Sequence, residues 1–247
     1  MMSDRRVYFL IFLLPLIMMT GSFDAAAAES EVAGKDDFVP LYQGKPYLHV
    51  VYQGRSIKVQ RVQDPDFQLR GYFAKTARKC PPFCLRPMAV DRRVKTVGEI
   101  EIFHFMEDQL RDGGGLLIDA RTPNWHKKGT IPGSVNIPFT DLTKEASDPR
   151  TIELLKSFGA KPRQPVGAFT RQLEKWGMTD TKYKTDQWDF TDAKLLVLWC
   201  NGPTCGQSPR AIEGLLKLGY PADKLNYYRG GMQMWQLFGL TTVIPKG

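Results

Sequence analysis

The clearest structural pattern in the sequence is Leu195-Leu-Val-Leu-Trp-Cys-Asn-Gly-Pro-Thr-Cys-Gly-Gln-Ser-Pro-Arg210. Its apolar beginning, residues 195–199, predicts a short buried strand of a parallel sheet. Residues 208–219 predict a helix, with Ser208 as N-cap, Pro209 in the first helical position and Gly219 at the end. A strand that passes through a short loop into a helix is the repeating unit of an α/β protein.

Cys200 stands where this strand ends and the loop begins. Loop amides and the dipole of the following helix favour an anion there and should lower the pKa of a thiol. We therefore predict Cys200 as the nucleophile and Cys205 as the second catalytic thiol. Cys205 either resolves a sulfenate on Cys200 by forming an internal disulfide, or closes a permanent bridge with it. The residues expected to bind substrate are those of the loop: Asn201, Gly202, Pro203, Thr204, Gly206, Gln207 and Ser208.

The N-terminus has the pattern of an export signal. Arg5 and Arg6 precede an apolar run at 7–19, and Ala25–Ala28 follows. We predict a secretory signal peptide over residues 1–28, cleaved near Ala27/Ala28. The run is too short to span a bilayer comfortably, so the mature chain is expected in the periplasm without a membrane span.

Charge and cysteine spacing narrow the ligands. The chain has 247 residues and a formal net charge of +8. Export argues against nucleic acid as a partner, and scattered basic residues are compatible with small anionic substrates. The pairs Cys80/Cys84 and Cys200/Cys205 lack the usual zinc spacing, so we expect no metal, and we expect no cofactor. In an exported chain, Cys80 and Cys84 form a structural disulfide or a relay that exchanges with the other pair.

The composition changes near residue 96. Residues 29–95 predict a β-rich extension that holds a hairpin at 47–62, with a turn at 53–55 and a bulge near Val62, and the loop of Cys80 and Cys84. Residues 96–247 alternate between helices and strands, interrupted by an insertion at about 141–190. Helices are expected at 97–110, 208–219 and 231–238, and strands at 116–119, 134–137, 195–199 and 225–228. This order predicts an α/β domain whose parallel sheet is flanked by helices.

Four stretches together resemble the rhodanese domain over residues 96–243. They are Leu117-Ile-Asp-Ala-Arg121, Gly129-Thr-Ile-Pro-Gly-Ser-Val-Asn-Ile-Pro138, the helix from Ser208 to Gly219, and Arg229-Gly-Gly-Met-Gln-Met-Trp235. The resemblance implies that Cys200 takes a sulfane sulfur as a persulfide and passes it to a thiol or to cyanide. It also implies that Cys205 can resolve this persulfide by forming the internal disulfide, and that Asp119 and Arg121 pair beneath the loop. Arg210, in the helix that follows the loop, is a further residue expected to support the site.

The loop departs from the family pattern in two ways. Cys200 lies two residues further from Ser208 than usual, and Gln207 stands where an arginine is usual. The loop is similar to the double-cysteine loop of some exported bacterial rhodanese-like proteins. His126 is either a base near the site or, because two lysines follow it, a surface residue.

Three hypotheses about function follow. The first is a periplasmic rhodanese-like sulfurtransferase whose partners are a small sulfur-containing anion and a thiol acceptor. The second is a thiol–disulfide redox protein that uses Cys200 and Cys205. The third is a catalytically inactive rhodanese-fold module that binds an exported redox protein.

Overall fold

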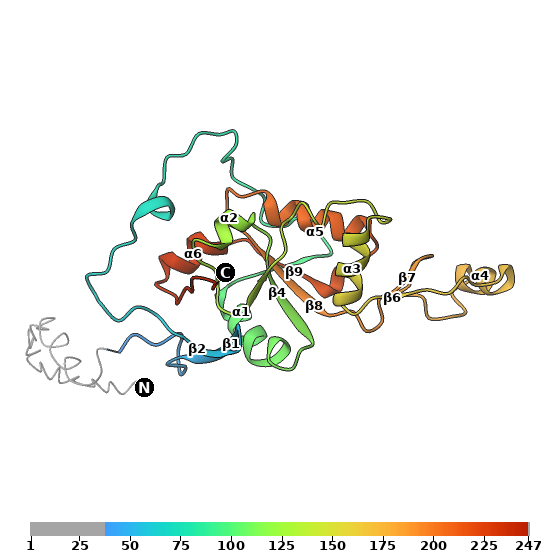
Figure 1. Cartoon of the computed structure of the whole chain (residues 1–247), viewed down its shortest axis with the longest axis horizontal. Coiled ribbons are helices and arrows are strands. Elements are labelled where there is room, and N and C mark those ends of the chain that lie inside the picture. The colour runs from blue at the N-terminus through green and yellow to red at the C-terminus, as the bar shows by residue number, and fades with distance from the viewer. Residues whose placement is uncertain (1–37, 247) are drawn as a thin grey trace, which may run out of the picture. The chain divides into compact units, whose positions relative to one another are not determined.

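A five-stranded parallel sheet forms the centre of the molecule (Figure 1). The computed structural model describes residues 38–246, so the predicted signal peptide lies outside the described residues. The sheet has the order β3-β9-β8-β4-β5. Its strands are β3 (Lys95–Val97), β4 (Gly115–Asp119), β5 (Ser134–Asn136), β8 (Leu195–Trp199) and β9 (Leu225–Tyr228). The predicted parallel α/β architecture is confirmed, and β8 occupies the central position.

Both faces of the sheet are covered, because alternate side chains of each strand enter different cores. Leu196 and Leu198 of β8 pack in one core with two helices, whereas Val197 and Trp199 pack in the other. The helices of the first core are α3 (Pro149–Ser157) and α5 (Gln207–Lys217). The helices of the second are α1 (Glu99–Phe105), its π-helical continuation η2 (Met106–Leu110) and α6 (Gly231–Leu237). The apolar run at 195–199 is therefore explained by burial on both sides.

An antiparallel hairpin joins the second core. Its strands are β1 (Leu48–Tyr52) and β2 (Arg55–Val59), paired from Leu48 with Val59 to Tyr52 with Arg55. The turn consists of Gln53 and Gly54, both with positive φ, which suits the twist of a two-residue hairpin. The predicted three-residue turn was thus one residue too long, and β2 ends at Val59 rather than continuing to a bulge at Val62.

The start of the predicted helix at 97–110 was wrong. Residues 95–97 form β3, whose only strand neighbour in the described sheet is β9, and α1 begins after Gly98. The Gly98 N–H donates to the Glu101 carboxylate at 2.9 Å, which satisfies a free amide at the helix start. Three residues that include a lysine have no sequence pattern typical of a strand. They form one here because they pair with β9, which is distant in the sequence.

The predicted insertion at 141–190 has two different parts. Leu154 and Leu155 of α3 are buried in the first core. The following part holds α4 (Ala168–Lys175), with Phe169 75% exposed, and the short antiparallel pair β6 (Lys161–Pro162) and β7 (Trp188–Asp189). The remaining short helices are η1 (Gly71–Ala74), α2 (Pro123–His126) and η3 (Ala222–Lys224). Between residues 38 and 246, no helix has both the length and the apolar character that crossing a membrane requires.

Candidate active site

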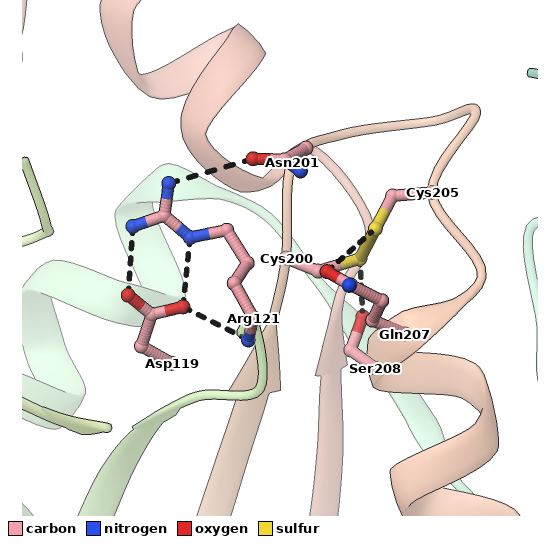
Figure 2. Close-up of a disulfide and its surroundings, with 7 residues drawn as sticks. All are labelled: Asp119, Arg121, Cys200, Asn201, Cys205, Gln207 and Ser208. Atoms are coloured by element: carbon pink, nitrogen blue, oxygen red, sulfur yellow. Dashed lines mark hydrogen bonds and ion pairs between the residues drawn. A yellow bond between two sulfur atoms is a disulfide. The ribbon is translucent and has the colours of Figure 1, made fainter. Parts of the chain in front are cut away.

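Cys200 and Cys205 lie together at the carboxyl end of β8, joined as a disulfide (Figure 2). Cys200 is 2% exposed, whereas Cys205 is partly exposed on the loop. The loop turns tightly, since the Cys205 N–H donates to the Gly202 carbonyl at 2.8 Å. A reagent from solvent therefore reaches the sulfur of Cys205 more readily than that of Cys200.

Ser208 is not the N-cap that the sequence predicted. Gly206 caps α5, the helix begins at Gln207, and Ser208 is buried in its first turn. Its hydroxyl donates to the Sγ of Cys200 at 3.0 Å (Figure 2). The side chain points toward the end of β8 instead of closing the helix, so it can stabilise negative charge on the Cys200 sulfur.

Asp119 and Arg121 form the predicted pair beneath the loop, and both are buried. The guanidinium donates to both carboxylate oxygens, from Nε at 2.8 Å and from Nη2 at 2.7 Å. Burial alone would raise the pKa of Asp119, but the hydrogen bonds from Arg121 and His126 outweigh it and hold the pKa below its usual range. Nη1 of Arg121 also reaches Oδ1 of Asn201 at 3.4 Å, which links this pair to the catalytic loop (Figure 2).

His126 does not have the surface position that the neighbouring lysines suggested. Its side chain is 14% exposed, and Nδ1 lies 2.9 Å from Oδ2 of Asp119. Thr130 donates its hydroxyl to the same oxygen at 3.0 Å. Among the described residues, the ring hydrogen-bonds Asp119 rather than either cysteine, so His126 helps to order the carboxylate.

The first residues of α6 hold the beginning of the loop. The amides of Met232 and Gln233 donate to the carbonyls of Cys200 and Asn201 at 2.9 and 3.1 Å. Gly231 has a φ of +52°, and a side chain there would overlap the Cys200 carbonyl. A residue without a side chain at position 231 therefore lets the chain turn tightly from β9 into α6.

A pocket of about 320 Å³ opens beside Cys205, and its outer wall was missed by the sequence analysis. That wall comes from residues 72–86, which the sequence assigned to a β-rich extension that holds the loop of Cys80 and Cys84. The lining residues are Tyr72, Arg78, Pro82, Phe83, Arg86, Trp125, Asn201, Thr204, Cys205, Gly206, Gln207 and Arg210. Arg210 lies at this pocket, whereas Ser208 is buried beside Cys200 and does not line it. Residues distant in sequence gave no signal of this proximity.

A second disulfide joins Cys80 and Cys84, and Pro82 and Phe83 between them line the same pocket. Across residues 38–246, no three His, Cys, Asp or Glu side chains come together as a metal site would need. A larger cavity of about 680 Å³, lined by Gln60, Arg70 and Thr241 among others, includes neither Cys200 nor Cys205.

Comparison with known proteins identifies the domain. The sequence profile of the rhodanese-like domain family matches residues 104–237. The human single-domain sulfurtransferase TSTD1 is 19% identical, with 58% of this chain and 96% of that chain covered and a TM-score of 0.34. A rhodanese-related protein from Thermoplasma volcanium is 18% identical, with 61% and 99% covered and a TM-score of 0.33.

A third structure, a possible tyrosine phosphatase from Rhodopseudomonas palustris, is 17% identical, with 62% and 88% covered and a TM-score of 0.37. No curated protein matches the chain. The profile match spans more than half of the sequence and includes β4, the Asp119–Arg121 pair, the whole cysteine loop and α5. The chain therefore belongs to the rhodanese-like domain family.

Proposed function

We propose that this protein is an exported sulfurtransferase that carries sulfane sulfur as a persulfide on Cys200. The observation that carries the proposal is the position of Cys200: at the end of β8, before α5, with the Ser208 hydroxyl 3.0 Å from its sulfur. The hydroxyl and the positive end of the helix dipole both stabilise an anion on that sulfur.

In the first step, the Cys200 thiolate attacks the outer sulfur of a donor such as thiosulfate. A bond forms between the two sulfurs, the sulfur–sulfur bond of the donor breaks, and sulfite leaves with its electron pair. In the second step, the Cys205 thiolate attacks Sγ of the Cys200 persulfide and releases the outer sulfur as sulfide, which takes up a proton. The product is the Cys200–Cys205 disulfide, and a dithiol then restores both thiols by exchange.

Mass spectrometry of the reduced protein with thiosulfate or glutathione persulfide tests this scheme. We expect one additional sulfur atom on Cys200 to accumulate in Cys205→Ser. The wild type should release sulfide and end as the disulfide, and Cys200→Ser should take up no sulfur. If Cys205→Ser remains unmodified with both donors, the sulfurtransferase proposal is wrong.

A second candidate function is thiol–disulfide exchange, favoured by the different exposure of the two sulfurs. An external thiolate would attack Sγ of Cys205, and Cys200 would leave as a thiolate beside Ser208. In Cys200→Ser, the Cys205 thiolate should attack an activated pyridyl disulfide, release thiopyridine and keep the other half of the reagent as a lasting mixed disulfide. A periplasmic dithiol protein with one of its two cysteines replaced would then attack Cys205, displace the thiopyridine as leaving group and remain attached as a mixed disulfide, which detects the exported redox partner.

The periplasmic location is part of the proposal. The arginines and apolar run of residues 1–28 support it, as do two disulfides in the described chain. Fractionation of cells that produce the full chain, followed by N-terminal sequencing, tests it. A cytoplasmic product that retains Met1 would overturn it.

A further inference from the structure

The pocket beside Cys205 contains three arginines and no carboxylate. Arg78, Arg86 and Arg210 line it, and none of the lining residues is Asp or Glu. None of the three takes part in an ion pair with any residue between 38 and 246. Arginine is always protonated in proteins, so the pocket carries positive charge that no carboxylate among residues 38–246 neutralises in an ion pair.

Arg78 is held in place by aromatic rings. Its guanidinium carbon lies 4.2 Å from the centre of the Tyr72 ring and 5.7 Å from that of Phe83. Nη2 donates to the Tyr72 carbonyl at 2.8 Å. Nε is buried and has no hydrogen-bond partner. A buried donor without an acceptor costs free energy, so placing this guanidinium at the pocket destabilises the unliganded chain.

Arg86 is anchored to the catalytic loop through its backbone. Its N–H donates to the Pro203 carbonyl at 2.9 Å, and its own carbonyl accepts from Nη2 of Arg229 at 2.8 Å. Its guanidinium lies against Gly206, where any side chain would overlap it. Nε of Arg86 is also buried without a partner. The described part of the chain contains only four such buried atoms, and two of them are in arginines of this pocket.

The volume of the pocket and its aromatic side chains indicate what a ligand would need besides negative charge. A volume of about 320 Å³ lies at the lower end of the range for small-molecule sites and exceeds what a lone inorganic anion fills. Tyr72, Phe83 and Trp125 provide aromatic surface. The rings of Tyr72 and Trp125 lie 4.6 Å apart between centres, so these two walls are packed against each other. Flat apolar groups stack on such rings.

We propose that Arg78, Arg86 and Arg210 form a binding site for an organic anion, one with a sulfonate-like or carboxylate group on a flat apolar body. Two of these arginines come from residues 72–86, so that segment supplies the positive charge that the loop lacks at Gln207. That this ligand is the donor or acceptor of sulfur rests on the proposed function, but its binding does not require sulfur transfer.

Calorimetric titration of the oxidised protein after removal of the predicted signal peptide tests the site. The probes are benzenesulfonate, its neutral analogue benzenesulfonamide, and inorganic sulfate. We expect benzenesulfonate to bind at least tenfold more tightly than either of the others, with an affinity that falls as salt is added. Arg86→Gln and Arg210→Gln should each weaken benzenesulfonate binding by about tenfold, the loss expected for one charge-assisted hydrogen bond.

Arg171→Gln is the matched control, because Arg171 is an exposed arginine on α4 that does not line the pocket. Arg210 is itself exposed on α5, so Arg210→Gln remains informative if Arg86→Gln fails to fold. Equal binding of benzenesulfonate and benzenesulfonamide, or equal binding by Arg210→Gln and wild type, would overturn the anion site. If sulfate binds as tightly as benzenesulfonate, the proposal that the ligand has a flat apolar body is wrong. Mass measurement of the Cys200 persulfide is independent of all these results.

Discussion

A single hydroxyl sets the environment of the buried sulfur. Ser208 was expected to cap a helix, and it instead donates to Cys200 from inside the first turn of α5. Local sequence could not distinguish these roles, because a serine before a proline and an apolar helix satisfies the rule for an N-cap. Packing of α5 against the end of β8 decides the outcome by turning the side chain inward.

Ser208→Ala should lower the reactivity of Cys200. The hydrogen bond to a thiolate contributes about 1.5–3 kcal/mol, so its loss should slow alkylation of Cys200 by iodoacetamide at least tenfold. The rate is measured in Cys205→Ser, where Cys200 cannot form the internal disulfide. Ser157→Ala, which removes a hydroxyl bonded to the Leu154 carbonyl, is the control. Equal rates for Ser208→Ala and its parent would show that the hydroxyl does not act on the sulfur.

Asp119→Asn should destabilise the fold, because it leaves the guanidinium of Arg121 buried without a negative partner. Breaking a buried pair in this way costs about 3–5 kcal/mol. The native pKa of Asp119 is below its ordinary value of 3.8, so the carboxylate contributes its stability above about pH 4. That contribution is lost as the pH falls through the native pKa.

Urea unfolding at several pH values measures this effect. The difference in free energy of unfolding between wild type and Asp119→Asn should be fully present at pH 5 and should narrow below about pH 4. Asp112→Asn, at an exposed ion pair, should change little throughout. If the difference in free energy of unfolding between wild type and Asp119→Asn does not depend on pH, Asp119 does not carry the buried charge.

At the scale of elements, α5 is fixed by its contact with the turn at Leu142. A methyl group at Gly214 would overlap the carbonyl oxygen of Leu142. Gly214→Ala should therefore cost about 1–3 kcal/mol through overpacking, although alanine favours helices. Gly167→Ala is the matched control, since its added methyl group meets nothing. If both variants have the same midpoint of urea unfolding as wild type, the close approach of α5 to this turn is not rigid.

The elements that the sequence predicted well are those with a strong local pattern. Strand β8 was predicted with its observed bounds because five apolar residues in a row are typical of a strand buried on both faces. Strand β9 was also predicted with its observed bounds. Strand β3 was missed because three residues become a strand only beside β9. The pocket wall was missed for the same reason, since Arg78 and Arg86 meet Cys205 only through the tertiary fold.

At the scale of the whole molecule, the segment before the sheet is part of the same structure. Leu48, Val50 and Val59 of the hairpin are buried with Trp235 of α6 in the second core. The sequence predicted the hairpin and its strands but treated it as an extension of unknown role. Its apolar side chains instead share the second core with α1, η2 and α6, and β1 contacts η2.

Leu48→Ala should reduce the free energy of unfolding by about 2–5 kcal/mol, as for other leucines truncated in a core. Leu48 is 2% exposed, and Val51 on the same strand is 72% exposed. Val51→Ala therefore removes methyl groups that face solvent and should leave the midpoint of urea unfolding nearly unchanged. Similar values for the two variants would mean that the hairpin does not stabilise the domain.

The backbone hydrogen bond from the Arg86 amide to the Pro203 carbonyl makes the cysteine loop depend on a segment that is distant in the sequence. The double-cysteine loop cannot be transferred to another protein with its pocket intact. Grafted alone onto another scaffold, it would carry its two sulfurs but would leave Arg78, Arg86 and the aromatic wall behind. A successful transplant would need residues 71–88 and Arg229 as well, since these hold the segment against the loop.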